Sequence, residues 1–211
     1  MSLAIREGAN PAAKFLFERW AQVIETHKAS ENTEIEIRFG RAVNNGSSRA
    51  FDTNVGKPTF QKVLQALTRY EGWESTDHSE VTVYYFDGGK RLSVNEQTEE
   101  QKGEIKTRVK VDDFQLPNEP LDVRLGISTE VPFEYDGEET STEQKTKERW
   151  SFVRKNLSID MTIITGNPDD KDSDDDKTYQ IELEIIDPTK MQNKIELFNL
   201  LYKVFDMMKL L

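Results

Sequence analysis

Cysteine is absent from the 211-residue sequence, and histidine occurs only twice. Without cysteine, disulfides, thiolate zinc sites, iron–sulfur clusters and a cysteine nucleophile are all excluded. Long apolar runs are lacking as well. No stretch approaches the ~20 residues that span a bilayer, and the opening residues MSLAIREGANPAAK lack the apolar core of a signal peptide. We therefore expect a soluble, intracellular protein with no membrane partner.

Positive charge is also scarce, since the formal net charge is −11. Such an acidic chain is unsuited to coating nucleic acid through nonspecific phosphate contacts. Any phosphate site must therefore be a local basic pocket. There is no Walker sequence and no glycine-rich turn between a strand and a helix. The length fits one domain, and we expect it to span residues 1–211.

Three segments show the helical spacing of apolar residues. They are Pro11 to His27, a segment that follows Lys57-Pro58-Thr59, and a C-terminal segment from about residue 189 to 211. Each carries one apolar stripe, and the middle segment has a proline in its opening turn. We interpret all three as helices that pack against a core.

The rest of the chain is dominated by the two-residue alternation of β-strands. Eight segments show it: 33–40, 80–87, 90–95, 104–111, 121–131, 145–154, 157–165 and 178–186. The links Asp87-Gly88-Gly89 and Lys155-Asn156 are short enough to close hairpins, so neighbouring strands should pair antiparallel. The sequence thus predicts a mainly β (α+β) fold, an eight-stranded antiparallel β-barrel over about residues 33–186 with packing helices.

Two longer loops interrupt this pattern. The stretch from Gly40 to Gly56 is rich in Gly, Asn and Ser and is expected to be mobile. The acidic stretch DDKDSDDDK, from Asp169 to Lys177 in a loop of about residues 167–177, is expected to be flexible and solvated. A calcium site is a weaker alternative there, because the spacing of an EF-hand loop is missing.

The first and last strands each carry two carboxylates on one face. Glu34 and Glu36 alternate with apolar residues, and Glu182 and Glu184 do the same. Residues two apart on a strand lie about 7 Å apart, so these like charges repel unless a cation sits between them. Four such oxygen ligands would suit Mg²⁺ or Mn²⁺. The alternative is a pair of solvated edge strands whose charges prevent aggregation.

The intervening strands carry basic residues on one face. With the polar and acidic residues that share these faces, the sets are Arg91 and Ser93; Lys106, Arg108 and Lys110; Asp122, Arg124, Ser128 and Glu130; and Lys145, Lys147, Arg149 and Ser151, with Asp160 and Thr162 on the strand that follows. If these faces point inward, a basic wall lies opposite an acidic one, an arrangement suited to a polyanion with a metal ion. The alternative places the charged faces in water and fills the barrel with apolar side chains.

The motifs TEIEIRFG, KTKERWSF, SIDMTII and YQIELEII, in this order, resemble the metal-dependent RNA 5′-triphosphatases of fungi, protozoa and large DNA viruses. These enzymes belong to the triphosphate tunnel metalloenzymes, whose fold is an eight-stranded antiparallel barrel around a hydrophilic tunnel. The resemblance covers about residues 33–186. Arg38 after the first glutamate pair favours the capping branch, because relatives with the CYTH-type motif normally have lysine there.

The resemblance also implies roles for individual residues. Metal binding is implied for Glu34, Glu36, Glu182 and Glu184, with Mg²⁺ or Mn²⁺ as the cofactor. Glu130 matches an acidic residue that acts on the attacking water, and Asp160 and Thr162 match a motif that orients a basic neighbour. Phosphate binding is implied for Arg38, Arg91, Lys106, Arg108, Arg124, Lys145, Lys147, Arg149 and Ser151, with Lys147 and Arg149 counted as catalytic.

The expected function is therefore removal of the γ-phosphate from triphosphate-ended RNA in the first step of mRNA capping. The resemblance also implies hydrolysis of nucleoside triphosphates and a guanylyltransferase partner, in cis or in trans, at a nuclear or viral site. Two alternatives stay open. One is a tunnel enzyme that acts on inorganic tripolyphosphate or free nucleotides, and the other is a non-catalytic barrel that binds a polyanion.

Overall fold

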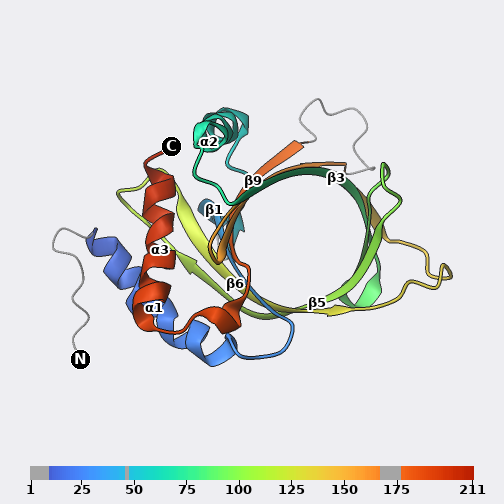
Figure 1. Ribbon diagram of the computed structural model, residues 1–211, viewed down its shortest axis with the longest axis horizontal. Helices are drawn as coiled ribbons and strands as arrows, with labels where there is room; N and C mark the ends of the chain where they lie inside the picture. The colour runs from blue at the N-terminus through green and yellow to red at the C-terminus, as the bar shows by residue number, and fades with distance from the viewer. Residues whose placement is uncertain (1–9, 46–47, 167–176) are drawn as a thin grey trace.

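The alternating segments close into a barrel in the computed structural model, which describes residues 10–45, 48–166 and 177–211 (Figure 1). The barrel strands are β1 (Thr33–Asn45), β3 (Ser75–Tyr85), β4 (Lys90–Val94), β5 (Gln101–Phe114), β6 (Asp122–Pro132), β7 (Glu143–Arg154), β8 (Leu157–Thr165) and β9 (Lys177–Ile185). All neighbours are antiparallel in the order β1-β6-β5-β4-β3-β7-β8-β9, and β9 pairs back with β1. This confirms the predicted eight-stranded antiparallel barrel.

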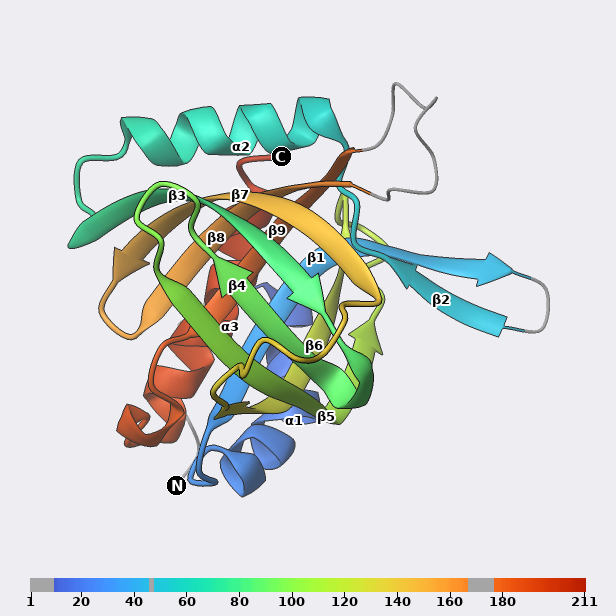
Figure 2. The ribbon, with the colours of Figure 1, turned by 90° about the vertical axis from the view of Figure 1, so that its right-hand side faces the viewer.

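A further strand, β2 (Ser48–Asp52), lies outside the barrel. It pairs with the second half of β1, from Arg41 opposite Asp52 onward, and this ribbon projects beyond one end of the barrel (Figure 2). The predicted mobile loop from Gly40 to Gly56 is therefore wrong over much of its length. Gly40 permits the close pairing, because a Cβ atom there would lie 2.1 Å from the carbonyl oxygen of Asp52.

The three predicted helices are present as α1 (Pro11–His27), α2 (Lys57–Arg69) and α3 (Lys194–Met208). The last is shorter than the predicted 189–211. A separate 3₁₀ turn, η2 (Pro188–Lys190), comes first, and Asn193 then starts a new helix by accepting from two backbone amides. None of the helices within the described residues combines the length and apolarity needed to cross a membrane.

The hydrophobic core lies outside the barrel, between the strands and the helices. Ile35 and Ile37 of β1 pack in one buried cluster with Trp20 of α1 and Val204 of α3, and Figure 1 shows α1 and α3 against this side of the barrel. On another side, the Phe60 ring of α2 meets the Tyr179 ring of β9 with centroids 5.4 Å apart. Because the apolar faces point outward to the helices, the charged faces point inward, and the alternative of an apolar barrel interior is excluded.

The turns agree with the expected hairpins. The link between β3 and β4 is the short turn η1 (Asp87–Gly89), in which Gly88 has φ 73°. Lys155, with φ 56°, turns the chain between β7 and β8. The acidic stretch 169–176 lies outside the described residues, and Lys177 after it already belongs to β9.

Candidate active site: a charged tunnel through the barrel

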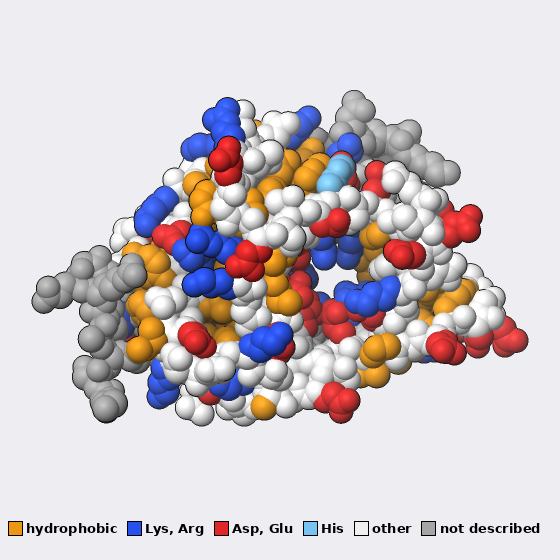
Figure 3. Space-filling view, viewed as in Figure 1, with side chains coloured by type: hydrophobic (Ala, Val, Ile, Leu, Met, Phe, Trp, Pro, Cys, Tyr) orange, Lys and Arg blue, Asp and Glu red, His pale blue; other side chains and the backbone are white. Residues whose placement is uncertain are grey.

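A cavity of about 610 Å³ runs inside the barrel and is lined by side chains from all eight of its strands. In the space-filling view, acidic and basic side chains face each other across the opening (Figure 3). Most of the predicted site residues line this cavity: Glu34, Glu36, Arg38, Arg91, Lys106, Arg108, Arg124, Glu130, Lys145, Lys147, Arg149, Thr162, Glu182 and Glu184. Residues distant in the sequence therefore line one cavity, which we call the tunnel.

Ser151 and Asp160 are the predicted residues that do not line the tunnel. They lie opposite each other in the register of β7 and β8, and Asp160 is buried. Asp160 accepts a hydrogen bond of 2.6 Å from Ser158 Oγ and lies 3.7 Å from Arg149 Nη1. The Arg149 Nε donates to Thr162 Oγ1 at 3.2 Å. These contacts with β8 fix the position of the Arg149 guanidinium.

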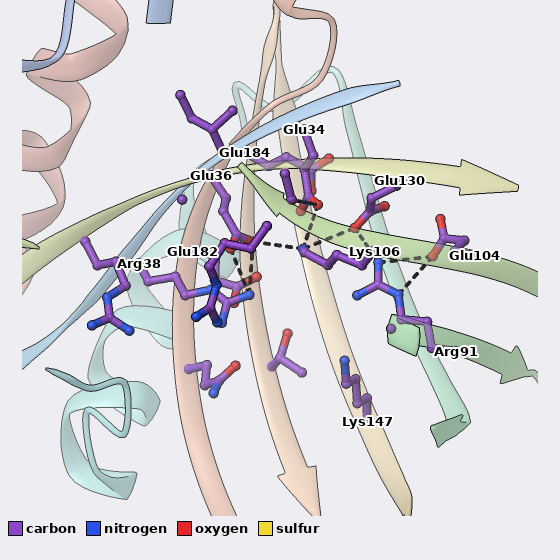
Figure 4. A pocket seen from close by; sticks show the side chains of 18 of the residues that line it. Glu34, Glu36, Arg38, Arg91, Glu104, Lys106, Glu130, Lys147, Glu182 and Glu184 are labelled. Atoms are coloured by element: carbon purple, nitrogen blue, oxygen red, sulfur yellow. Dashed lines mark hydrogen bonds and ion pairs between the residues drawn. The ribbon is translucent and has the colours of Figure 1, made fainter. Parts of the chain in front are cut away.

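Lys106 is the centre of an acidic cluster at one end of the tunnel. Its Nζ lies 2.6 Å from Glu34 Oε2 and 3.1 Å from Glu130 Oε1 (Figure 4). Burial and a hydrogen bond with Glu130 raise the pKa of Glu34 to about 8. Burial acts to raise the pKa of Glu130 as well, but the hydrogen bond with Glu34 and the charges of Arg91 and Lys106 lower it. Glu130 is therefore the anionic member of this pair.

Arg38 links the carboxylates of β1 and β9. The strand register places it opposite Glu182 and places Glu36 opposite Glu184. The Arg38 Nη2 lies 3.0 Å from Glu36, and its Nε lies 3.0 Å from Glu182 without the angle of a hydrogen bond. Burial opposes ionisation of Glu36, but the charges of Arg38 and Lys106 lower its pKa below the usual value. Arg38 thus keeps the Glu36 carboxylate ionised in the centre of the tunnel.

Glu184 stands apart from these pairs. Within the described part of the chain, no Lys or Arg forms an ion pair with its carboxylate. Burial and the charge of Asp160 raise the pKa of Glu184 to about 7. It lies directly opposite Glu36, on the same face as Glu34. An added cation would meet least competition from protein groups at this carboxylate.

The donor chemistry of this end fits a hard divalent cation, because only carboxylate oxygens are offered. In the described residues, however, no three Asp, Glu or His side chains are arranged to hold a metal ion. The reason lies in the ion pairs, since Lys106 and Arg38 occupy the carboxylates of Glu34, Glu36 and Glu182. These side chains would have to turn from their basic partners toward Glu184 to coordinate a metal.

The tunnel cations without a carboxylate partner among the described residues include Lys147, toward the other end, and Arg108, which lies on β5 opposite Ser128. Arg124, in contrast, is held by Asp113 at 2.6 Å. Lys147 is labelled in Figure 4 away from every dashed contact. Burial and the charge of Arg149 lower the pKa of Lys147 to about 8. A half-buried ammonium with no ion pair among the described residues is stabilised by an anion.

The register sorts these charges along the tunnel. On the adjacent strands β6, β1 and β9, Glu130 and Glu34 lie toward one mouth, while Arg124, Arg38 and Gln180 lie toward the other. Figure 4 shows the same order, with Glu34 and Glu130 at one end of the view and Lys147 at the other. We call these ends the acidic mouth and the basic mouth; the ribbon of β1 and β2 continues from the basic mouth.

The sequence patterns missed some of the lining residues. Glu104 is buried and pairs with Arg91 at 3.1 Å, and Tyr85 lies beneath Lys145 and Lys147. Glu104 has the same parity as Lys106 on β5, so the alternation could have found it. Beyond Arg108, a bulge ends that alternation and places Lys110 opposite Ile127, a core residue. Lys110 nevertheless lines the tunnel together with Lys106 and Arg108.

Comparisons with known proteins agree with this geometry. A family model described as "mRNA capping enzyme, beta chain" matches residues 86–202, which is more than half of the chain. No curated protein matches the sequence.

Solved structures show the same fold. The S. pombe Pct1 RNA triphosphatase superposes with a TM-score of 0.70 at 19% identity, over 98% of this chain and 88% of that one. Pct1 in complex with the Spt5 CTD gives 0.72 at 16% identity, over 98% and 94% of the two chains. The Mimivirus capping enzyme triphosphatase gives 0.61 at 16% identity, over 93% of this chain and 98% of that one.

The closed barrel and its tunnel of opposed charges, together with the family match, assign the chain to the triphosphate tunnel metalloenzymes. Within that class, the chain belongs to the mRNA triphosphatase family, the β chain of the mRNA capping enzyme. It is accordingly a metal-dependent hydrolase of the phosphoric anhydride bond at RNA 5′-triphosphate ends.

Proposed function

We propose that the tunnel removes the γ-phosphate from triphosphate-ended RNA, the first step of mRNA capping, and that Mg²⁺ or Mn²⁺ is the metal. One observation carries this proposal. A single cavity places buried carboxylates of β1 and β9 across from basic side chains of β5 and β7, some of which have no carboxylate partner among the described residues. A triphosphate with a divalent cation is the ligand whose charges complement both walls.

The basic side chains would bind the phosphoryl oxygens. Lys147 and Arg108 are free of carboxylates among the described residues, and Arg149 is oriented by Asp160 and Thr162. These positive groups, buried in or lining the cavity, would stabilise the charge that spreads over the transferred phosphoryl group. Lys145 and Arg124 lie further toward the basic mouth and would hold the phosphate nearer the nucleoside.

The carboxylates of Glu34, Glu36 and Glu184 would hold the metal, and Glu182 would keep Arg38 in place beside them. Their oxygen donors fit Mg²⁺ or Mn²⁺. When bound, such an ion neutralises charge on the γ-phosphate oxygens. Glu34 would then give up its contact with Lys106, whose ammonium would keep Glu130 as a partner and also face the phosphate.

Glu130 would position the attacking water. Its carboxylate remains ionised, because Glu34, Arg91 and Lys106 lower its pKa against the opposing effect of burial. An anionic carboxylate with so low a pKa accepts a hydrogen bond from water but is a weak base. Its contribution would therefore be orientation for in-line attack, and no covalent intermediate is required.

The same groups would act on nucleoside triphosphates, and we propose this as a side activity. We also propose a guanylyltransferase, in cis or in trans, as the partner that uses the diphosphate end. The reaction would take place in the nucleus or at a viral site. Two rival functions remain to be tested against this one: hydrolysis of inorganic tripolyphosphate as the main activity, and polyanion binding without turnover.

The test measures release of labelled phosphate from γ-labelled 5′-triphosphate RNA with Mg²⁺ or Mn²⁺. Glu184→Gln is the sharpest variant, because no ion pair among the described residues depends on that charge. We expect turnover to fall by about 10²–10³-fold, the usual loss for one electrostatic group of an active site. Folding should be unharmed, and at pH 8 the melting temperature should be equal or higher, because the substitution removes a buried carboxylate whose pKa is raised.

Glu148→Gln is the matched control, since Glu148 lies on β7 outside the tunnel, against His78. It should retain wild-type turnover. Release of phosphate from tripolyphosphate but not from RNA would favour the first rival. A folded wild type that binds these polyanions and releases no phosphate would favour the second and contradict the proposal.

A further inference from the structure

We propose that a hollow outside the basic mouth is the subsite for the first nucleoside of the RNA substrate; this rests on the function proposed above. The hollow, which we call the vestibule, has a volume of about 460 Å³. It is lined by Phe51, Asp52, Thr53 and Asn54 on one side and by Lys145, Ile164, Gly166, Thr178 and Gln180 on the other.

The vestibule is an extension of the tunnel. Lys145, Ile164 and Gln180 line both spaces, so a ligand can occupy the two together. A triphosphate in the tunnel would therefore carry its nucleoside into the vestibule, provided that the RNA chain points toward the basic mouth. The volume is ample for one base and its ribose.

The charges favour this direction for the RNA. Toward the acidic mouth, Glu104 and Glu130 would repel the phosphodiesters that follow the first nucleotide, and Arg91 and Lys106 offset part of this repulsion. Toward the basic mouth, Lys147 has no ion pair among the described residues and would attract them, and Arg124 and Lys145 follow with one carboxylate partner each. A polyanion threaded with its free end near the carboxylates and its chain beside the cations has the lower electrostatic energy.

The vestibule itself suits a neutral group better than another phosphate. Its charged side chains are Asp52 and Lys145, and the Lys145 ammonium pairs with Glu143 at 2.7 Å, so the vestibule has no surplus of positive charge. The Thr53 hydroxyl accepts a hydrogen bond of 2.9 Å from Gln180 Nε2 and keeps its own O–H to donate. The Asp52 and Asn54 side chains add acceptors and donors of the kind that ribose hydroxyls and base edges use.

Phe51 supplies an aromatic surface in this polar setting. The Arg124 guanidinium lies over its ring at 4.7 Å from the centroid, and Asp113 holds that guanidinium at 2.6 and 3.0 Å. The ring is therefore fixed before any ligand binds. A fixed aromatic ring beside a positively charged mouth is the arrangement on which nucleic-acid bases stack, irrespective of sequence.

The experiment compares equilibrium binding of two ligands in the presence of Mg²⁺ by isothermal titration calorimetry. One is a 5′-triphosphate dinucleotide with a β,γ-imido bridge that resists hydrolysis, and the other is imidotriphosphate, which lacks the nucleoside. The proteins are the wild type, Phe51→Ala, Phe51→Tyr and Phe15→Ala. Phe15 is the matched control, because it is an aromatic residue of α1 that is 65% exposed and lines neither space.

We expect Phe51→Ala to weaken binding of the dinucleotide by roughly 5–150-fold, the range for loss of one base–aromatic stack. Binding of imidotriphosphate should change by less than about twofold on the same scale. Phe51→Tyr should restore dinucleotide binding, and Phe15→Ala should match the wild type.

Equal loss of both ligands in Phe51→Ala would overturn the proposal, since it would mark Phe51 as a support for Arg124 and the tunnel. Unchanged dinucleotide binding would overturn it as well. Because binding is measured without turnover, a selective loss of dinucleotide binding would support the subsite even if the phosphate-release assay showed no activity. The proposed subsite and the proposed function can therefore be contradicted independently.

Discussion

The barrel has two unlike walls, one covered by helices and one bare. The covered wall is formed by β1, β6, β8 and β9, whose outward side chains belong to the hydrophobic cluster shared with the helices. The bare wall is formed by β3, β4 and β5; in the described chain, none of their fully buried side chains belongs to that cluster. In Figure 2 the bare wall faces the viewer with no helix over it.

We propose that the two walls have different roles in the site, with the metal ligands on the covered wall and phosphate-binding cations on the bare wall. The carboxylates Glu34, Glu36 and Glu184 stand on the covered wall, where the other side of each strand is locked by packing. The bare wall carries Arg91, Lys106 and Arg108, which have longer side chains and lie on parts of β4 and β5 that contribute no buried side chain to the cluster. Helix α1 contacts β5 only further along the strand, at Asp112 and Phe114 among the described residues. A metal site needs rigid donors, whereas cations that follow a phosphate through reaction gain from freedom to adjust.

Stability should depend mainly on the covered wall. Ile37→Ala removes a side chain that is 1% exposed in the cluster, and we expect the free energy of unfolding to fall by about 2–5 kcal/mol. Thr107→Ala on the exposed face of β5 should change it by no more than about 0.5 kcal/mol. Urea unfolding followed by circular dichroism measures both. Equal losses would show that the bare wall is held by packing after all.

Binding of polyphosphate should depend on pH through Lys147. Burial and the charge of Arg149 lower its pKa to about 8, so the ammonium is charged below that pH and neutral above it. Affinity for tripolyphosphate should therefore fall above pH 8 by up to about tenfold per pH unit, since one proton must be bound. Lys147→Arg keeps the charge at every pH.

The ratio of the two dissociation constants, wild type over Lys147→Arg, cancels the titration of the ligand itself. It should rise above pH 8 and be level below pH 7. A ratio that stays level over the whole range would show that Lys147 does not contact the bound phosphates.

The two-residue alternation was sufficient to predict the barrel and most of the tunnel lining. It worked because the inward-facing residues of each strand lie two positions apart and alternate with the outward-facing ones. The starts of the helices at Pro11 and Lys57 could also be predicted from the sequence. The sorting of acidic and basic residues onto different strands then indicated that the charged faces point inward.

Other features depended on pairing that no local pattern encodes. The bulge after Arg108 follows from the register of β5 against β6, and β2 follows from the close approach of Gly40 to Asp52. Nor could the alternation show which charges pair. That Arg38 and Lys106 occupy the carboxylates while Glu184 has no basic partner in the described structure depends on distances across the barrel.

The assignment of the metal to the covered wall is tested most directly by titrating Mn²⁺ by calorimetry at pH 8 into wild type, Glu184→Gln and Lys147→Ala, whose substituted residue lies on β7 outside that wall. The account predicts that Lys147→Ala binds Mn²⁺ like the wild type, while Glu184→Gln loses about tenfold or more in affinity, as expected for an altered metal ligand. Undiminished Mn²⁺ binding by Glu184→Gln, or loss of binding in Lys147→Ala alone, would contradict the assignment of the metal to the covered wall.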